Sequence, residues 1–242
     1  MDHDLGRPSK IVCVGRNYHA HARELGGHVP SEPLIFFKPP SALSAAGDPV
    51  LLPPGVGRVD FEGEIAFVVG RRCRFVREEE GWDHLSHVVP ANDVTARELQ
   101  RADGQWTRAK GFDTFCPIGT PVPLSAVEPE ELRVETRVNG ELRQEGSVRE
   151  MAFSPPALVA FISRIMTLEP GDLILSGTPE GVGPLLPWDD VEVSIPGVGA
   201  VANPVRSGPG APWRPVGGTA TGPARSMSRS QLRAGPPGRG GG

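Results

Sequence analysis

Three carboxylates stand at alternate positions in the segment Asp60-Phe61-Glu62-Gly63-Glu64, and their spacing suggests a shared chemical role. Alternate residues of a β-strand face the same side, about 7 Å apart, so these side chains would line one face. The apolar run Ile65–Val69 follows at once and predicts that the strand enters the core. Buried carboxylates need a cation, and oxygen ligands without His or Cys suit Mg²⁺, Mn²⁺ or Ca²⁺. The alternative is a solvated acidic edge strand.

A second polar stripe is predicted on a helix over Asp93–Arg101. Asp93, Arg97 and Gln100 occupy positions i, i+4 and i+7, which share one helix face. An acid, a base and an amide on one stripe could supply a metal ligand and two groups that orient a substrate. The alternative is an exposed helix with an ordinary ion pair between Asp93 and Arg97.

A histidine and a glutamate lie close together near the start of the chain. His21 and Glu24 are spaced i, i+3 in a short predicted helix, Tyr18–Leu25, so their side chains can hydrogen-bond. A carboxylate that orients an imidazole makes a competent general base. The helix precedes the glycine- and proline-rich connection Gly26–Pro33, a position that suits a lid. The alternative is a surface His–Glu pair without catalytic work.

Lysine is rare in this chain: only Lys10, Lys38 and Lys110 occur among 25 basic residues. An ammonium group is compact and can shift its pKa, so lysines retained among many arginines are candidates for roles that arginine cannot fill. Chance is the alternative explanation. A further candidate is the turn Ser176–Pro184, whose backbone N–H groups could receive a carboxylate.

The composition favours strands and turns. Glycine (31) and proline (27) together make up 58 of 242 residues, which excludes a helical bundle or coiled coil. Apolar runs predict strands at Lys10–Val14, Leu34–Phe37, Phe61–Gly70, Leu173–Leu175 and Val191–Ile195. A two-residue Asn139-Gly140 turn predicts a hairpin that joins Arg133–Val138 to Glu141–Arg143.

Helices are few in the predicted fold. Asn17 is expected to cap the helix Tyr18–Leu25, and Gly26-Gly27 to end it. Ser154 opens the one amphipathic helix, predicted over Pro155–Met166 with prolines in its first turn. The predicted fold class is therefore α+β, mostly β, with two or three short helices.

Charge divides the chain into two parts. The net charge of the whole chain is −4, and residues 206–242 hold six Arg and no acid, so residues 1–205 carry −10. The last part is also rich in Gly and Pro and has little apolar surface to bury. We expect a catalytic domain over 1–205 and a disordered Gly/Pro/Arg-rich tail over 206–242. The acidic body and the lack of interleaved aromatic residues argue against specific nucleic-acid binding.

No targeting or membrane signal is evident in the sequence. Apolar runs such as Ile65–Val69 are too short to cross a bilayer. The first residues, Met1–Asp4, lack a basic region followed by an apolar stretch. Three scattered cysteines form neither a disulfide framework nor a metal knuckle. We expect a cytoplasmic protein without membrane contact.

Six motifs occur in an order that resembles the fumarylacetoacetate hydrolase family, over about Lys10 to Val205. The resemblance is closest to its compact acylpyruvate hydrolase and oxaloacetate decarboxylase branch. It implies a mixed β-sandwich roll with a few short helices. The motifs are Gly15-Arg16-Asn17-Tyr18 with His21 and Glu24, Phe36-Phe37-Lys38-Pro39, Asp60–Glu64, Asn92–Arg97, Lys110–Asp113 and Gly177–Pro184.

The resemblance also implies roles for individual residues. Its metal ligands fall on Glu62, Glu64 and Asp93, with one Mg²⁺ or Mn²⁺ ion bound. Asp60 falls beside the metal ligands, where it would contact a ligand and not the metal itself. The remaining positions are the catalytic His21, Glu24 and Lys110 and the substrate-binding Arg16, Lys38, Arg97, Gln100 and Thr178. The resemblance alone implies a homodimer.

The implied activity is a divalent-metal-dependent hydrolysis of a C–C bond in a 2-oxo acid of acylpyruvate type. Cleavage leaves an enolate, whose charge the metal and Lys110 would stabilise. The same scaffold supports oxaloacetate decarboxylation, or isomerisation and decarboxylation of 2-hydroxyhepta-2,4-diene-1,7-dioate in aromatic catabolism. A non-catalytic metabolite-binding relative is a remoter alternative. The sequence leaves the substrate, the dominant reaction and the choice of Mg²⁺ or Mn²⁺ open.

Overall fold

Two β-sheets form the framework of the protein. The computed structural model describes residues 7–24 and 28–212. Its larger sheet has six strands, in the order β10 (Val122–Pro123), β7 (Leu85–Asn92), β6 (Gly63–Val69), β13 (Leu173–Leu175), β1 (Ile11–Gly15) and β2 (Leu34–Lys38). The second has five strands, in the order β12 (Glu141–Ser147), β11 (Arg133–Val138), β15 (Asp190–Ile195), β16 (Gly199–Ser207) and β4 (Val50–Leu52).

Smaller elements complete the fold. A three-stranded sheet has the order β14 (Gly183–Pro184), β5 (Val59–Phe61) and β8 (Thr95–Ala96), and β3 (Leu43–Ser44) pairs with β9 (Cys116–Pro117). The α-helices are α1 (His19–Glu24), α2 (Arg97–Ala102), α3 (Thr107–Lys110) and α4 (Pro155–Ile165). The 3₁₀ helices are η1 (Pro40–Ala42), η2 (Glu78–His84), η3 (Leu124–Ala126), η4 (Pro129–Glu131) and η5 (Val148–Glu150).

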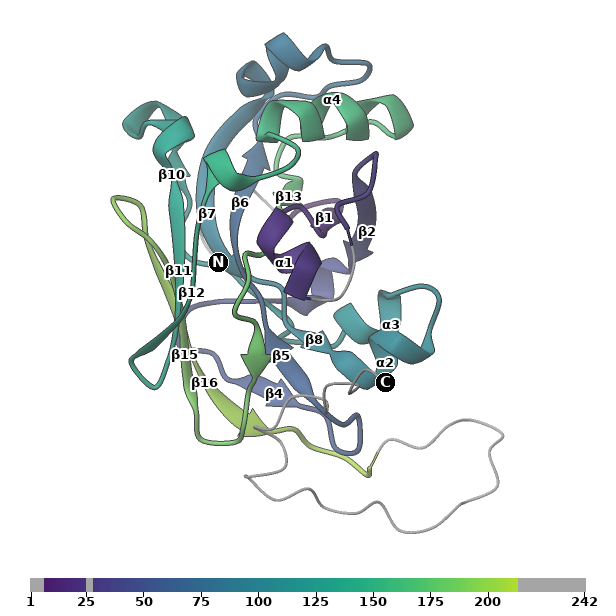
Figure 1. Cartoon of the computed structure of the whole chain (residues 1–242), viewed down its shortest axis with the longest axis vertical. Coiled ribbons are helices and arrows are strands. Elements are labelled where there is room, and N and C mark those ends of the chain that lie inside the picture. The colour runs from purple at the N-terminus through teal and green to yellow at the C-terminus, as the bar shows by residue number, and fades with distance from the viewer. Residues whose placement is uncertain (1–6, 25–27, 213–242) are drawn as a thin grey trace, which may run out of the picture.

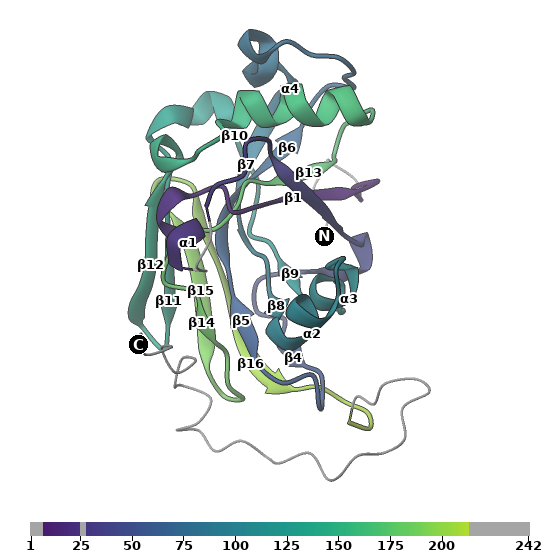
Figure 2. The same cartoon turned by 45° about the vertical axis from the view of Figure 1, so that its right-hand side comes forward.

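Both sheets are mixed. The six-stranded sheet has one parallel pair, β1 with β13, among antiparallel neighbours, and the five-stranded sheet has one, β16 with β4. In Figure 1, α4 lies at one end of the molecule, and α1 lies between it and the pair α2 and α3; Figure 2 shows the same order. The mostly-β fold predicted from the sequence, with a few short helices, is confirmed.

Strand β6 is buried on both faces, which explains its unbroken apolar sequence. On one face, Ile65 and Phe67 pack in a cluster with Val193 of β15 and Leu158 of α4. On the other face, Ala66 and Val68 belong to a second cluster, with Ile11 and Leu173. A central strand covered on both sides loses the alternation that a half-exposed strand shows. Fully burying an aliphatic side chain contributes roughly 1.5–3 kcal/mol, so this strand anchors the core.

Local turn and capping chemistry acts as the sequence predicts in two places. Asn139 and Gly140 both have positive φ, at 53° and 80°, the geometry of a tight turn between β11 and β12. The Ser154 hydroxyl accepts a hydrogen bond from the Ala157 N–H at the start of α4. Both elements therefore form where local sequence specifies them.

Asn17 does not cap helix α1, contrary to expectation. Its side-chain oxygen accepts a hydrogen bond from the Phe153 N–H, and its amide donates to the carbonyls of Phe153 and Ser176. The side chain is fully buried and ties three segments together. Gly26 and Gly27, predicted to end α1, lie outside the described residues.

The C-terminal strand extends past the predicted domain boundary. Strand β16 continues to Ser207, with Arg206 and Ser207 paired to Leu51 and Leu52 of β4. The first two residues assigned to the tail therefore belong to the folded body, because their backbone completes a ladder. Most of the predicted tail, residues 213–242, lies outside the described residues. None of the described helices is long and apolar enough to span a membrane.

Candidate active site

The predicted metal ligands lie where two paired strands pass from one sheet to another. Strands β6 and β7 pair in the six-stranded sheet, with Gly63 opposite Asn92 and Glu64 opposite Ala91. Just beyond this pairing, the same two chain segments form β5 and β8 of the small sheet. Glu62 stands at the break, and its carbonyl accepts a hydrogen bond from the Asp93 N–H at 2.8 Å. The strand register therefore brings together residues about thirty positions apart.

Two expectations about these segments need correction. The strand predicted over Phe61–Gly70 is divided, because β5 ends at Phe61 and β6 begins at Gly63. The helix predicted from Asp93 begins only at Arg97, since Thr95 and Ala96 form β8. Asp93 therefore reaches the site from a strand end, and not from the helix face it was expected to share with Arg97.

Glu62, Glu64 and Asp93 form a buried carboxylate cluster. One oxygen from each side chain lies within 4.8 Å of the others. The Gly177 N–H donates to Glu64 Oε2 at 2.7 Å, and the Asn92 side-chain oxygen accepts from the Glu62 N–H at 2.9 Å. Burial raises the pKa of Glu64 well above its usual value, with Asp93 and Glu62 adding repulsion, despite opposing effects of Lys110 and the Gly177 N–H.

The ammonium of Lys110 bridges two members of this cluster. It lies 2.8 Å from Glu62 Oε2 and 2.6 Å from Asp93 Oδ2, and the side chain is 1% exposed. Burial alone would lower the pKa of Lys110, but Asp93 and Glu62 outweigh burial and raise it. Burial likewise opposes ionisation of Glu62, yet Lys110 and Arg97 hold its pKa well below the usual value. Both groups are therefore charged at neutral pH.

Lys38 lies behind the cluster and not in the cavity where a substrate contact was expected. Its ammonium lies 2.7 Å from Asp93 Oδ1 and donates to the Val94 carbonyl. The side chain is fully buried and is absent from the residues that line the cavity. Its geometry is that of a group that fixes Asp93, whose other oxygen faces Lys110.

A chain of ion pairs holds the Glu62 oxygen that does not contact Lys110. Arg97 donates from Nη1 to Glu62 Oε1 at 2.7 Å and from Nε to Asp60 Oδ2 at 2.8 Å. Arg58 donates two further hydrogen bonds to Asp60. Gln100 accepts from Arg97 Nη1 at 2.9 Å, so the two residues do share a helix face. Asp60 thus stands one layer behind the ligands and orients Arg97.

The predicted His–Glu pair is formed on α1. His21 Nδ1 lies 3.0 Å from Glu24 Oε2, and the His21 side chain is only 4% exposed. The Gly181 N–H donates to the other Glu24 oxygen at 3.1 Å. The turn Ser176–Pro184 therefore receives carboxylates of the protein itself, Glu64 at Gly177 and Glu24 at Gly181.

Gly177 is required by its surroundings. Its φ is +99°, and a Cβ there would lie 2.9 Å from Asn17 Cβ and 3.1 Å from the Val14 carbonyl oxygen. Only glycine adopts this conformation readily. The close approach lets the Gly177 N–H donate to the Glu64 carboxylate, so the turn helps to position the carboxylate cluster.

Gln144 is a site residue that the sequence analysis missed. Its amide donates to Thr178 Oγ1 and to the Pro179 carbonyl, both at 2.8 Å, and its oxygen accepts from the Gly63 N–H at 3.0 Å. The Thr178 hydroxyl in turn donates to the Gly63 carbonyl. Gly63 lies between two ligands, so Gln144 fixes their backbone. The one signal in the sequence was that Gln144 is a polar residue at an inward-facing position of strand β12.

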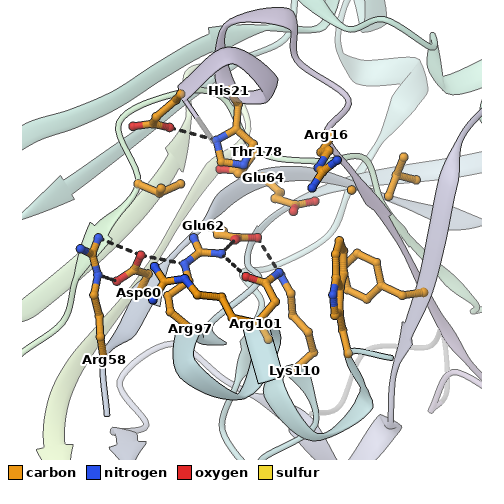
Figure 3. A pocket seen from close by; sticks show the side chains of 17 residues that line it. Arg16, His21, Arg58, Asp60, Glu62, Glu64, Arg97, Arg101, Lys110 and Thr178 are labelled. Carbon is orange, nitrogen blue, oxygen red and sulfur yellow. Dashed lines mark hydrogen bonds and ion pairs between the residues drawn. The ribbon is translucent and has the colours of Figure 1, made fainter. Parts of the chain in front are cut away.

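A cavity of about 660 Å³ opens onto the cluster, with α1 on one side and α2 and α3 on the other (Figure 3). His21 lies across the cavity from Arg97 and Lys110, and Glu62 lies between them. Phe36, from the motif Phe36–Pro39, also lines it, and so do Arg58, Arg101 and Trp106, for which the sequence predicted no role. The predicted residues on its wall are Arg16, His21, Glu24, Glu62, Glu64, Arg97, Gln100, Lys110 and Thr178.

The cluster has the properties of a divalent-metal site. Its donors are carboxylate oxygens from three buried side chains, with no His or Cys among them. Such a donor set suits Mg²⁺ or Mn²⁺, and also Ca²⁺, and does not suit Zn²⁺. Burial, with added repulsion from Asp93 and Glu62, raises the pKa of Glu64, and a bound cation would offset these effects. The residues present therefore fit the cation that the resemblance implies.

Comparisons with known proteins agree with this architecture. Residues 10–206 match the fumarylacetoacetate (FAA) hydrolase C-terminal family, and the chain belongs to this family. The mitochondrial oxaloacetate tautomerase FAHD1 of Bos taurus is 44% identical over 193 residues, which cover 78% of this chain and 87% of that protein. The relatives in this family with named activities are enzymes.

Solved structures are also similar. The 5-carboxymethyl-2-hydroxymuconate delta-isomerase from Mycobacterium smegmatis is 42% identical, with a TM-score of 0.78 over 84% of this chain and 81% of that one. Maleylpyruvate hydrolase from Sphingobium sp. SYK-6, in complex with manganese(II) and pyruvate, is 37% identical, with a TM-score of 0.74 over 84% and 72%. The fold is thus shared by proteins that isomerise and proteins that hydrolyse.

Proposed function

We propose that this protein is a divalent-metal-dependent hydrolase that cleaves a C–C bond in 2-oxo acids of acylpyruvate type. The observation that carries the proposal is the buried cluster of Glu62, Glu64 and Asp93, facing a His–Glu pair across one cavity. The manganese and pyruvate held by the maleylpyruvate hydrolase relative support it. Mg²⁺ or Mn²⁺ is the proposed cofactor.

The carboxylates of Glu62, Glu64 and Asp93 would hold the cation, which supplies Lewis acidity toward the oxygens of a 2-oxo acid. Lys110 keeps its ammonium beside the cluster, where negative charge develops on the substrate as the C–C bond breaks. A fixed cation in a buried site stabilises such charge without reorganising. Lys38 holds Asp93 in place from behind.

His21 is proposed to activate water. Glu24 bonds to Nδ1, which leaves Nε2 as the basic nitrogen. A general base with an oriented imidazole can take a proton from water that attacks the distal carbonyl. Arg16, Gln100 and Thr178 are proposed to contact the substrate, and Arg97 both supports Glu62 and faces the cavity.

A second candidate is isomerisation or decarboxylation through the same enolate. The identities to an oxaloacetate tautomerase and to a delta-isomerase, 44% and 42%, favour it specifically. These reactions need the cation and Lys110 but no activated water. The presence of His21, Glu24 and Lys110 together argues against a non-catalytic binding protein. A homodimer remains our proposal, from the family resemblance alone.

The decisive experiment is a substrate panel assayed with Mg²⁺. Acetylpyruvate, fumarylpyruvate, oxaloacetate and a 2-hydroxydienoate would be supplied in turn, with products separated by chromatography. Hydrolysis of an acylpyruvate as the fastest reaction supports the first proposal. Faster tautomerisation, decarboxylation or isomerisation would replace it with the second.

A further inference from the structure

The ammonium of Lys110 has an aromatic contact in addition to its ion pairs. Its nitrogen lies over the face of the Phe36 ring, 4.9 Å from the ring centre, and Phe36 is 8% exposed. A cation over a ring face, within about 6 Å of the ring centre, is attracted by the negative charge of that face. The ion-pair partners of Lys110, Glu62 and Asp93, belong to the carboxylate cluster. Phe36 therefore acts on Lys110 from outside the cluster.

Strand β2 supplies two neighbouring side chains to the ion pair between Lys110 and Asp93. Phe36 and Lys38 are alternate residues of the strand, so they face the same side, and both are buried. The Phe36 ring contacts the Lys110 ammonium, and Lys38 forms an ion pair with Asp93 at 2.7 Å. Phe37 lies between them on the opposite face and is 40% exposed. One face of β2 therefore holds both partners of the buried ion pair.

The Phe36 ring is itself held by Trp106. The two rings meet edge to face, with centres 5.1 Å apart and 69° between their planes, an arrangement that aromatic pairs prefer. The Trp106 carbonyl accepts a hydrogen bond from the Lys110 N–H at 3.0 Å, so both residues belong to one helical turn. A Cβ at Gly15 would lie 3.0 Å from the Trp106 ring, which is thus packed closely against the end of β1. Phe36, Trp106 and Lys110 form one packed unit between β2 and α3.

An aromatic face suits this place better than another carboxylate would. Burial raises the pKa of Glu64, and repulsion from Asp93 and Glu62 adds to the effect, so a further negative charge nearby would increase the repulsion. The ring attracts the ammonium without adding a full charge. The Lys110 side chain is 1% exposed, so the ring also occupies a side of the ammonium that water would otherwise solvate.

We propose that Phe36 is a positioning residue, whose ring face holds the Lys110 ammonium in the orientation that stabilises negative charge during the reaction. This inference rests on the proposed function, because it takes Lys110 as the group beside which that charge develops. Trp106 keeps the face of the ring turned toward the ammonium. A leucine at position 36 would fill much of the same space but would offer no such face, so the role of the ring can be separated from packing.

The first test observes the contact by NMR in the full chain, without substrate. The chain has only three lysines, so lysine labelled with ¹³C at Cε gives few signals, and Lys110→Arg identifies the signal of Lys110. Protons above a ring face are shifted upfield by the ring current. We expect an upfield Lys110 signal in the wild type, its retention in the matched control Phe37→Leu and its loss in Phe36→Leu. An unchanged Lys110 signal in Phe36→Leu would overturn the proposal.

The second test weakens the ring face and keeps the shape of the side chain. Phenylalanines with an increasing number of ring fluorines are placed at position 36, because fluorine withdraws electron density from the face that attracts the cation. With Mg²⁺ and the fastest substrate of the panel, we expect kcat to fall in steps, by about tenfold in total, with KM little changed. Tenfold corresponds to about 1.4 kcal/mol, within the range for buried cation–π contacts. The same series at position 37 is the control and should leave kcat unchanged.

The outcomes separate this inference from the proposed function. A constant kcat across the series at position 36, in an enzyme that turns over, would overturn the positioning role and leave the proposed function intact. Equal losses at positions 36 and 37 would also overturn it, because the effect would not depend on the contact with Lys110. Failure of the wild type to turn over any 2-oxo acid would overturn the proposed function and the catalytic role of the contact together.

Discussion

Lys110 and Asp93 form a fully buried ion pair, with 2.6 Å between the ammonium nitrogen and Oδ2. The other Asp93 oxygen is held by Lys38 at 2.7 Å, so two lysines fix one carboxylate. This arrangement uses two of the three lysines in the chain. Burial opposes the charge on Lys110, but Asp93 and Glu62 raise its pKa and keep it cationic.

Replacement of Lys110 by arginine should preserve the charge and lose activity. The compact ammonium fits between Glu62 and Asp93, whereas a planar guanidinium needs more room and a different donor geometry. We expect kcat to fall by about 10²-fold or more, the scale for loss of one electrostatic stabiliser. Steady-state kinetics on Lys110→Arg measures this, with Lys10→Arg as the control on a lysine outside the cavity. A near-normal kcat would exclude Lys110 from the chemistry.

His21 distinguishes hydrolysis from decarboxylation. If His21 activates water, His21→Ala should slow acylpyruvate hydrolysis by about 10²–10⁴-fold. Decarboxylation of oxaloacetate needs no activated water and should fall far less. Glu24→Gln should lie between, because it keeps the packing but weakens the 3.0 Å contact with Nδ1. Both reactions are measured on both variants, and equal losses in the two would mean that His21 positions the substrate.

Gln144 should affect metal binding although it is not a ligand. Gln144→Leu removes the acceptor of the Gly63 N–H between Glu62 and Glu64 and the donor to the Thr178 hydroxyl, which keeps its hydrogen bond to the Gly63 carbonyl. Mutation of residues that hydrogen-bond to metal ligands typically lowers metal affinity by about 10–100-fold. Calorimetric titration of Mn²⁺ measures the change, and circular dichroism checks that the variant is folded. Unchanged Mn²⁺ affinity in the folded variant would show that the ligands do not depend on this network.

Asp172 should stabilise the fold only above acidic pH. Burial alone would raise its pKa, but Lys10, the Glu169 N–H and Ser9 outweigh burial and lower the pKa below its usual value. A lowered folded-state pKa means that the stabilisation is present at neutral pH and is lost as the pH falls through that pKa. Asp172→Asn should therefore cost roughly 1–3 kcal/mol of unfolding free energy at neutral pH.

The Asp172 effect is measured by urea unfolding of the wild type and Asp172→Asn at neutral pH and at about pH 3. The difference in unfolding free energy should narrow at the lower pH, because about pH 3 lies below the ordinary pKa of an aspartate and the carboxyl of the unfolded wild-type chain takes up a proton there. Asp190→Asn, at an exposed position, is the control. A difference that stays constant across this pH range would contradict the assignment.

Local signals in the sequence predicted local structure well. The Asn139-Gly140 turn and the Ser154 cap depend on residues a few positions apart, and both formed as expected. Alternation also predicted that Glu62 and Glu64 lie together, and they do, although the strand is interrupted at Glu62.

Long-range pairing set the limits of the prediction. Asp93 joins the cluster because β6 and β7 pair with Gly63 opposite Asn92, a register that no local pattern contains. Asn17 bonds to Phe153 and Ser176, far along the chain, although its local context is that of a helix cap. Lys38 likewise forms an ion pair with Asp93 and does not line the cavity, where it was expected. Each departure has its cause in contacts between segments distant in sequence.

The central claim is that a divalent cation held by Glu62, Glu64 and Asp93 is needed for chemistry on a 2-oxo acid. The most direct test is turnover of acetylpyruvate by the full chain, first stripped with EDTA and then titrated with Mg²⁺ or Mn²⁺. Glu64→Gln, which keeps the size of the side chain but removes its charge, is assayed in parallel. We predict no turnover without metal, recovery on titration in the wild type, and no recovery in the variant. Full turnover by the metal-free wild type, or full recovery in Glu64→Gln, would contradict the account.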